Sequence, residues 1–277
     1  MRGTPVTTLS VEAIDQYRQW CIARGRSANT VKAYSSDLKE FLKAAGEDGL
    51  IQRDEYEELA MSWLNLTRNI VSPKTTARRL TTLKGFAKWM GLSDPLSDYI
   101  APVPSRTIPH PIPEGPEGVT RMCEQAKNNE QEALVALIGF VGCRVGEALS
   151  VTTSSIDTEN MMLTIRGKGD KTRVVPISEN AWRHIAPAFV VAHRKEDHRL
   201  VSYRDRFARQ VITNLAARAN LKRRVSSHDL RATFATAAFD KTGNIRVVQE
   251  LLGHANSATT EIYTGVADAQ LREAVDF

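Results

Sequence analysis

Four polar side chains near the C-terminus have the types that are needed to attack and hold a phosphodiester: His228, Arg231, His254 and Tyr263. Arginine suits the negative charge on non-bridging oxygens, because its planar guanidinium stays charged and can bind two oxygens at once. His228 and Arg231 are three residues apart, so a helix would place them on one face. The phenol of Tyr263 needs nearby cations or a base to act as a nucleophile, and His254 is expected to orient or stabilise it.

Two further candidates lie upstream of this set. Arg144 directly follows the apolar segment 133–141, where a charge is costly unless it is paired or used. We expect Glu147 to pair with it. Lys168 lies in a predicted turn between two glycines, from where it could donate a proton to a leaving oxygen. Lys171 is an alternative for that role.

Each candidate also fits an ordinary structural role when it is taken alone. His228 and His254 could be surface or capping residues, and Tyr263 could be a core residue. Arg144 could form only a structural pair with Glu147, and Lys168 could be a solvated turn lysine. The combination of residue types favours the chemical interpretation over these separate alternatives.

A proline-rich stretch divides the elements that must position these side chains. Six of the sixteen residues in 101–116 are proline, which fixes φ and removes the backbone donor. We therefore expect a helical domain over 1–100, a linker over 101–116 and a second domain over 117–277.

The first domain is expected to contain four or five helices. The strongest patterns are at 9–23, after the Ser27-Ala-Asn-Thr30 cap, at 55–66, and from Ser72-Pro73 onward. In the last of these helices, the basic residues lie largely away from the apolar stripe, a pattern that suits contact with DNA phosphates. A solvated helix face is the alternative. These basic residues are Lys74, Arg78, Arg79, Lys84 and Lys88.

The second domain is expected to be mostly helical with one small antiparallel sheet. Two strands, 161–166 and 171–177, flank a glycine-containing loop, and a further strand near 149–154 could join them. Leu230, Phe234 and Ala238 (or Ala237) are expected to be buried on the stripe opposite His228 and Arg231. The predicted helices are at about 117–128, 131–142, 178–188, 203–219, 227–240, 245–252 and 268–275, with a short turn at 257–263.

The composition is that of a soluble globular protein with reduced thiols. Of the 277 residues, 42% are hydrophobic and 25% are charged, and the longest apolar stretch, 133–143, is too short to span a bilayer. The three cysteines are far apart and form no CxxC pair. The net charge of +5 and the basic stretch 194–224 weakly favour a polyanionic partner. We therefore expect a cytoplasmic protein without a membrane partner.

The order of the candidates resembles that of the tyrosine recombinases, the phage integrase family. The similarity rests on Arg144, Lys168, His228-Asp-Leu-Arg231, Leu-Leu-Gly-His254 and Thr-Thr-Glu-Ile-Tyr263-Thr, and it covers the whole of 117–277. The helical first part resembles the family's SAM-like core-binding domain. Cys143 stands where the family usually has Leu or Met, which we interpret as a packing substitution.

The resemblance implies a transesterification on double-stranded DNA that needs neither metal nor ATP. Tyr263 would attack the scissile phosphate and form a 3′-phosphotyrosyl bond. Arg144, Arg231 and His254 would stabilise the transition state, and Lys168 would protonate the leaving 5′ oxygen with help from His228. The sequence contains no Walker A motif, HExxH motif or acidic metal cluster.

The resemblance also implies partners and biological roles. It implies core-type attachment sites, a tetramer on DNA, directionality or host accessory factors, and a tail helix, about 267–277, that docks on a neighbouring subunit. With no arm-binding domain before the first helices, the chain is most similar to a simple integrase that inserts or excises phage or mobile-element DNA in the bacterial cytoplasm. Resolution of chromosome or plasmid dimers by a Xer-type enzyme is the main alternative. A catalytically idle DNA-binding protein is a third, which the complete set of six residues disfavours.

Overall fold

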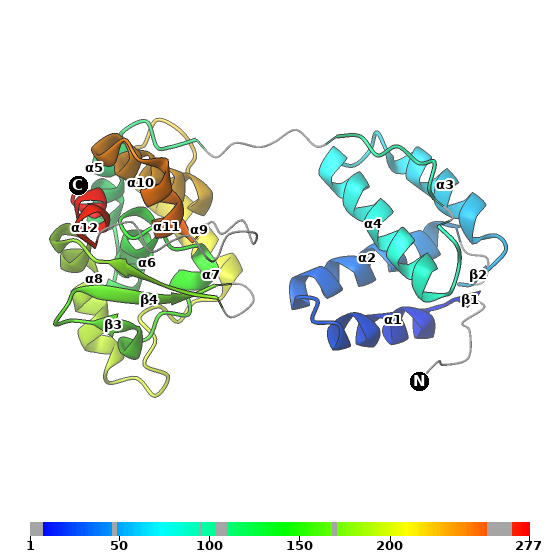
Figure 1. Cartoon of the computed structure of the whole chain (residues 1–277), viewed down its shortest axis with the longest axis horizontal. Coiled ribbons are helices and arrows are strands. Elements are labelled where there is room, and N and C mark those ends of the chain that lie inside the picture. The colour runs from blue at the N-terminus through cyan, green and yellow to red at the C-terminus, as the bar shows by residue number, and fades with distance from the viewer. Residues whose placement is uncertain (1–7, 46–48, 95, 104–109, 168–170, 254–267) are drawn as a thin grey trace. The chain divides into compact units, whose positions relative to one another are not determined.

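A computed structural model of the chain describes residues 8–45, 49–94, 96–103, 110–167, 171–253 and 268–277. Two compact units are formed, Met1–Thr107 and Ile108–Phe277, here called the first and second units (Figure 1). The division falls within the proline-rich stretch. Helix α5 (Gly115–Glu124) already begins inside that stretch, with Pro116 in its first turn, where a missing backbone N–H costs nothing.

The first unit contains the four helices that the sequence patterns predict: α1 (Val11–Ala23), α2 (Ala28–Ala45), α3 (Tyr56–Thr67) and α4 (Pro73–Trp89). The predicted cap at Ser27 is confirmed, because its hydroxyl accepts the Thr30 N–H at 3.3 Å. Strands β1 (Thr8–Leu9) and β2 (Ile51–Gln52) pair antiparallel and were not predicted. Two residues are too few to show an alternating pattern.

Aromatic side chains fill the core of the first unit. Phe41, Tyr56 and Phe86 are fully buried, and the rings of Phe41 and Phe86 both lie against Tyr56. The Tyr56 hydroxyl donates to the Leu83 carbonyl at 2.9 Å, so its polar atom is satisfied inside the core. These contacts join α2, α3 and α4.

Two of the five basic residues on α4 pair with acidic side chains of their own unit. Arg79 is buried, lies 4.4 Å from the Trp63 ring centroid and pairs with Glu40. Arg78 pairs with the buried Asp37. The expectation of an exposed basic face is therefore wrong for Arg79, whereas Arg78 keeps 37% of its side chain exposed. A periodicity pattern cannot reveal the acidic partners of these arginines on α2.

The second unit packs helices against a small antiparallel sheet whose strand order is β3-β4-β5 (Figure 1). Helix α6 (Asn129–Gly139) is its centre, with residues 133–138 fully buried and contacts to α5, α8 (Glu179–Ala192) and α10 (Ser227–Thr242). The other elements of this unit in the described residues are α7 (Val145–Ala148), the 3-10 helix η1 (Thr153–Ser155), β3 (Ile156–Asp157), β4 (Met162–Arg166), β5 (Thr172–Pro176), α9 (Asp205–Arg218), α11 (Ile245–Leu252) and α12 (Asp268–Val275).

The third strand of this sheet lies later than predicted. It is β3, at Ile156–Asp157, whereas the residues near 149–154 end α7 and form η1. The hydroxyls explain the error. Thr152 donates its N–H to Ser155 Oγ at 3.1 Å, and this local hydrogen bond overrides the strand preference of the β-branched residues.

The predicted tail helix is present as α12, and it packs against its own unit. Leu271, Ala274 and Val275 are buried. The Phe277 ring lies against Phe140 and Phe234, and the Phe277 carbonyl accepts a hydrogen bond from Asn180 at 3.1 Å. The apolar side of the tail is therefore covered within the same chain.

The three cysteines, Cys21, Cys123 and Cys143, are all buried free thiols. Burial raises the pKa of each, that of Cys143 to about 12. Among the described helices, none combines the length and apolar character that a membrane span requires.

Candidate active site

Arg144 stands at the turn between α6 and α7. Gly142 has φ +76°, a conformation that favours glycine, and a Cβ there would lie 2.5 Å from the Phe234 ring. The chain then extends through Arg144, which is the N-cap of α7. The predicted pair with Glu147 is confirmed, because Arg144 Nη1 donates to Glu147 Oε1 at 2.8 Å and the Arg144 backbone N–H donates to Oε2 at 2.8 Å. The Arg144 side chain remains 46% exposed.

Arg231 is on the second turn of α10, whose start is fixed by a capping box between Ser226 and Asp229. The predicted apolar stripe of Leu230, Phe234 and Ala238 is fully buried. Arg231 itself is only 9% exposed.

Carbonyl groups hold the Arg231 guanidinium on two sides. It donates to the Gly142 carbonyl before Arg144, and to the Leu252 carbonyl at 2.6 Å. Arg231 therefore joins the end of α6 to the end of α11. His228, on the same helix, is exposed.

One buried carboxylate organises these cations. Glu147 is 6% exposed and lies within 4 Å of three arginines: Arg144 and Arg173 at 2.8 Å each, and Arg231 at 3.6 Å. Burial opposes ionisation of Glu147, but hydrogen bonds from Arg173 and Arg144 outweigh it and lower the pKa of Glu147 to about 2. The carboxylate is therefore charged at neutral pH.

Burial and the neighbouring positive charges disfavour the charged form of Arg231. Burial, followed by the positive charge of Arg144, lowers the pKa of Arg231 to about 10, although Glu147 opposes the shift. Arg231 still keeps its charge at neutral pH. The arginine–glutamate cluster (Arg144, Glu147, Arg173 and Arg231) thus has three positive charges and one negative charge, a surplus that suits an anionic phosphate.

Arg173 was not among the predicted site residues. It lies on β5, is 12% exposed, and donates Nη2 to Glu147 and Nε to the Leu251 carbonyl at 2.9 Å. A signal for it exists in the sequence. Strand side chains alternate, so Arg173 shares the face of the buried Val175, and a charged residue on a buried face requires a partner.

Lys168, His254 and Tyr263 lie outside the described residues, but the segments that lead to two of them begin at the cluster. The Gly167 N–H donates to the Lys171 carbonyl at 2.7 Å, and a Cβ at Gly167 would lie 3.7 Å from Glu147 Oε1. Gly253, with φ +63°, ends α11 against the Arg173 side chain. Lys171, the alternative proton donor, is exposed.

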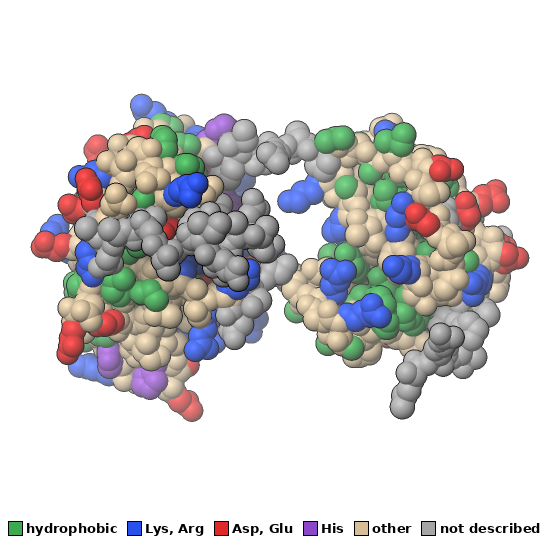
Figure 2. Space-filling model, in the orientation of Figure 1, with side chains coloured by type: hydrophobic (Ala, Val, Ile, Leu, Met, Phe, Trp, Pro, Cys, Tyr) green, Lys and Arg blue, Asp and Glu red, His purple; other side chains and the backbone are tan. Residues whose placement is uncertain are grey.

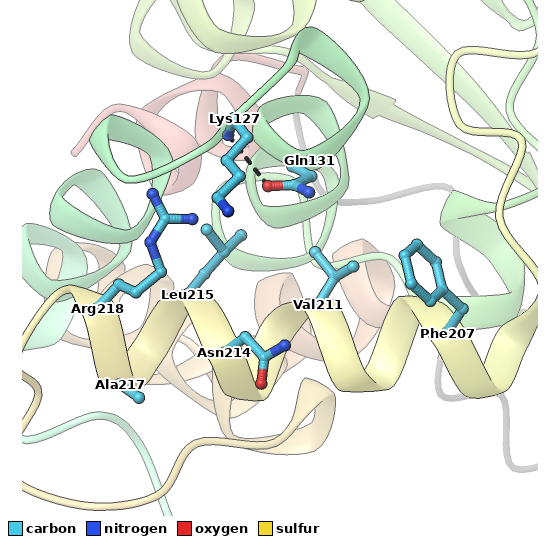
Figure 3. Close-up of a pocket in the computed structure, with 8 residues that line it drawn as sticks. All are labelled: Lys127, Gln131, Phe207, Val211, Asn214, Leu215, Ala217 and Arg218. Atoms are coloured by element: carbon cyan, nitrogen blue, oxygen red, sulfur yellow. Dashed lines mark hydrogen bonds between the residues drawn. The ribbon is translucent and has the colours of Figure 1, made fainter.

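A separate cavity of about 410 Å³ lies along α9 (Figure 3). Phe207, Val211 and Leu215 supply its apolar wall, and Lys127 and Arg218 lie at its edge. None of the described members of the predicted catalytic set lines it. Within the described ranges, no group of three or more His, Cys, Asp and Glu side chains is arranged to hold a metal ion.

Sequence comparison places both units in one class of proteins. The profile described as "Phage integrase family" matches residues 117–270, and the profile described as "Phage integrase, N-terminal SAM-like domain" matches residues 14–91. Tyrosine recombinase XerD of Rhizobium meliloti is 32% identical over 305 residues, covering 98% of this chain and 96% of that protein. Tyrosine recombinase XerC of Corynebacterium glutamicum is 33% identical and covers 90% and 85% respectively.

The fold has a solved counterpart. A lambda integrase dimer bound to a core site superimposes with a TM-score of 0.71, covering 96% of this chain and 78% of that one. The two sequences are 15% identical, so this likeness concerns the fold alone.

Proposed function

The chain belongs to the phage integrase family, and from that premise we propose that it is a site-specific recombinase that cuts and rejoins double-stranded DNA through a 3′-phosphotyrosine intermediate. One observation carries the proposal. Arg144 and Arg231, which are 87 positions apart in the sequence, share one buried glutamate and present surplus positive charge together.

Tyr263 is the proposed nucleophile. Its oxygen forms a bond to phosphorus while the bond from phosphorus to the 5′ oxygen breaks. Lys168 gives that oxygen a proton, and His228 assists proton transfer. Attack by the 5′-hydroxyl of another strand reverses the step and releases the tyrosine. The phosphodiester bond energy is kept in the covalent intermediate, so the proposed reaction needs neither ATP nor a metal ion.

Arg144, Arg231 and His254 stabilise the transition state in this proposal. Preorganised cations are effective because they need not reorganise when negative charge develops on the phosphate. The two carbonyl partners of Arg231 restrict its motion, and Arg144 is exposed enough to meet a phosphate. His228 is also exposed on the helix that carries Arg231.

The first unit is the proposed grip on core-type DNA sites. On its visible face, Lys and Arg side chains gather over one half, and acidic side chains lie mostly along the opposite edge (Figure 2). On α4, Lys74 and Lys88 are exposed, whereas Arg78 and Arg79 have acidic partners within the unit. Contacts between exposed lysines and DNA phosphates position a protein on DNA without reading the base sequence.

Self-association into a tetramer on DNA is part of the proposal, with directionality or host accessory factors as further partners. The chain would act in the bacterial cytoplasm. Docking of the tail on a neighbouring subunit would require α12 to leave the surface that it covers in its own chain, where Leu271 and Val275 are buried. The tail would thus exchange one apolar contact for another.

Integration and excision of phage or mobile-element DNA is the proposed role. Resolution of chromosome or plasmid dimers is the second candidate, because tyrosine recombinases XerD and XerC match nearly the whole chain at 32% and 33% identity. Sequencing joined DNA ends from cells that express the protein distinguishes the two roles. Junctions between an element and a chromosomal site support integration, whereas exchange only between identical chromosomal or plasmid sites supports resolution.

The chemistry is tested with a nicked suicide substrate, from which the short fragment that carries the new 5′-hydroxyl diffuses away. Wild-type protein is expected to accumulate a covalent DNA adduct, and Tyr263→Phe is expected to bind the same DNA without forming one. Tyr203→Phe is a matched control, because the Tyr203 hydroxyl hydrogen-bonds to Asn128, which is not a member of the predicted catalytic set. Adducts that persist in Tyr263→Phe would show that another residue is the nucleophile.

A further inference from the structure

Arg173 lies where three parts of the second unit meet. From β5 it reaches the buried Glu147 of α7 through Nη2 at 2.8 Å, and the Leu251 carbonyl at the end of α11 through Nε at 2.9 Å. Its stem lies against Gly253, since a Cβ there would be 2.9 Å from Arg173 Cδ. One side chain thus connects the strand that follows Lys168 in the sequence, the glutamate that binds Arg144, and the helix end before His254.

These contacts leave Arg173 little capacity to bind a substrate. Its side chain is 12% exposed, compared with 46% for Arg144. Its Nε and Nη2 groups already have acceptors within the protein. A buried guanidinium engaged by a carboxylate and a carbonyl acts on the reaction through its neighbours rather than by touching a phosphate.

Arg173 and Arg231 lie near the same carboxylate oxygen and bind neighbouring carbonyls. Both lie near Glu147 Oε2, Arg173 at 2.8 Å and Arg231 at 3.6 Å. Each also holds one of two successive carbonyls at the end of α11, those of Leu251 and Leu252 respectively. Because Arg173 occupies the closer place on the carboxylate, Arg231 remains directed at the Gly142 and Leu252 carbonyls.

We propose that Arg173 is a positioning residue for strand transfer, which keeps Arg231 from closing onto Glu147 and thereby holds the Arg144–Arg231 pair in its phosphate-binding arrangement. The inference rests on the proposed catalytic roles of Arg144 and Arg231. Without Arg173, Glu147 Oε2 loses its nearest cation. Arg231 is the next closest cation to that oxygen and is drawn toward it, because Glu147 then keeps Arg144 as its one close counter-ion and a buried carboxylate is costly when it is poorly paired. Arg231 then leaves its carbonyl partners and binds the phosphate less well.

The lysine substitution tests the geometry of this arrangement. Lysine keeps the charge beside Glu147, but one ammonium group cannot reproduce the fork that reaches both Glu147 and the Leu251 carbonyl. Arg173→Lys is therefore expected to cleave faster than Arg173→Ala and more slowly than wild type.

The experiment measures single-turnover cleavage of the suicide substrate at saturating DNA, well below the melting midpoint of the least stable variant. Arg173→Ala is expected to cleave about tenfold more slowly than wild type, with a DNA Kd within about twofold. A second substrate carries a methylphosphonate at the scissile position, which replaces a charged oxygen by a methyl group. On the methylphosphonate substrate, the rate defect of Arg173→Ala should shrink to about threefold or less, because this substrate carries less negative charge for Arg144 and Arg231 to stabilise.

Controls separate this inference from the proposed function and from general loss of structure. Arg183→Ala is the matched control, because Arg183 is an exposed arginine of α8 that forms neither an ion pair nor a hydrogen bond through its side chain with the described residues. It should cleave both substrates at the wild-type rate. An unfolded fraction would slow cleavage of both substrates equally, so a defect of Arg173→Ala that is the same on both overturns the inference.

Two other outcomes are also decisive. Cleavage by Arg173→Ala within about twofold of wild type overturns the positioning role, provided that Arg144→Ala and Arg231→Ala are inactive on the phosphate substrate. If those two variants cleave normally, the catalytic roles assigned under the proposed function are wrong instead.

Discussion

Replacing Glu147 by glutamine removes the one negative charge of the arginine–glutamate cluster and keeps the side-chain shape. Arg173 and Arg231, at 12% and 9% exposure, then remain buried without a counter-ion. Breaking one side of a buried ion pair costs about 3–5 kcal/mol in other proteins. We therefore expect the second unit to be clearly destabilised at neutral pH.

The pKa of Glu147 gives a separate magnitude. A fall from 4.5 to about 2 on folding corresponds to about 3 kcal/mol, at about 1.4 kcal/mol for each pKa unit. Since the folded pKa is depressed, this contribution is complete above the unfolded pKa and is lost as the pH falls through the folded pKa. It declines to about 2 kcal/mol at pH 3.5 and to about 1 kcal/mol at pH 2.5.

Urea unfolding at pH 7, 5 and 3.5 measures the difference between the two proteins. Hydrogen exchange of peptides from α6 and α10 reports the second unit alone, so unfolding of the first unit does not interfere. Glu196→Gln is the matched control, because Glu196 is an exposed glutamate of the same unit. At pH 7 the Glu147→Gln variant should lose about 3 kcal/mol, a fall of about 6–12 °C in melting midpoint for a unit of this size.

The pH dependence is the sharper part of this prediction. The gap between wild type and Glu147→Gln should narrow by about 1 kcal/mol between pH 7 and pH 3.5, whereas the gap for Glu196→Gln should not follow that course. A gap that stays constant over this range would show that Glu147 does not stabilise the fold through its charge. Its role would then be one of shape alone.

Three further predictions concern the reaction and the backbone that positions the arginine–glutamate cluster. Gly253→Ala should lose about 1–3 kcal/mol of stability and should also cleave more slowly, because φ +63° strains an alanine and the alanine Cβ would lie 2.9 Å from Arg173 Cδ. Thermal unfolding and adduct formation that both match wild type would contradict this prediction. Lys168→Ala should regain cleavage on a 5′-bridging phosphorothiolate, whose sulfur leaves without a proton; absence of rescue would move the proton-donor role, with Lys171 as the next candidate. Adduct formation should continue in EDTA, and a strict need for a divalent cation would defeat the proposed chemistry.

Local patterns predicted most helices well because the signals that fix them are local. The caps at Ser10, Ser72 and Ser226 each accept an N–H from the residue three positions later, and Gly253 ends α11 in the left-handed conformation. Local competition explains the main error, the third strand, where the hydroxyls near Thr152 favour a turn over a strand.

The site was predictable only where the residues that contact each other are close in the sequence. Arg144 and Glu147 are three residues apart, and their pairing follows from that spacing. The contacts of Arg231 with Gly142 and of Arg173 with Leu251 join segments that are distant in sequence, so no periodicity reveals them. Arg79 shows the same limit in the first unit, since its partner Glu40 lies on another helix.

The burial of Cys21, Cys123 and Cys143 has a practical consequence for following the protein on DNA. Maleimide and disulfide reagents react with accessible thiolates, and burial together with a raised pKa is expected to slow the reaction of these three thiols in the folded state. An exposed cysteine introduced into either unit would then be labelled selectively without removing a native one. A fluorophore pair placed in this way, one dye on each unit, would report in solution how the distance between the units changes when DNA is added.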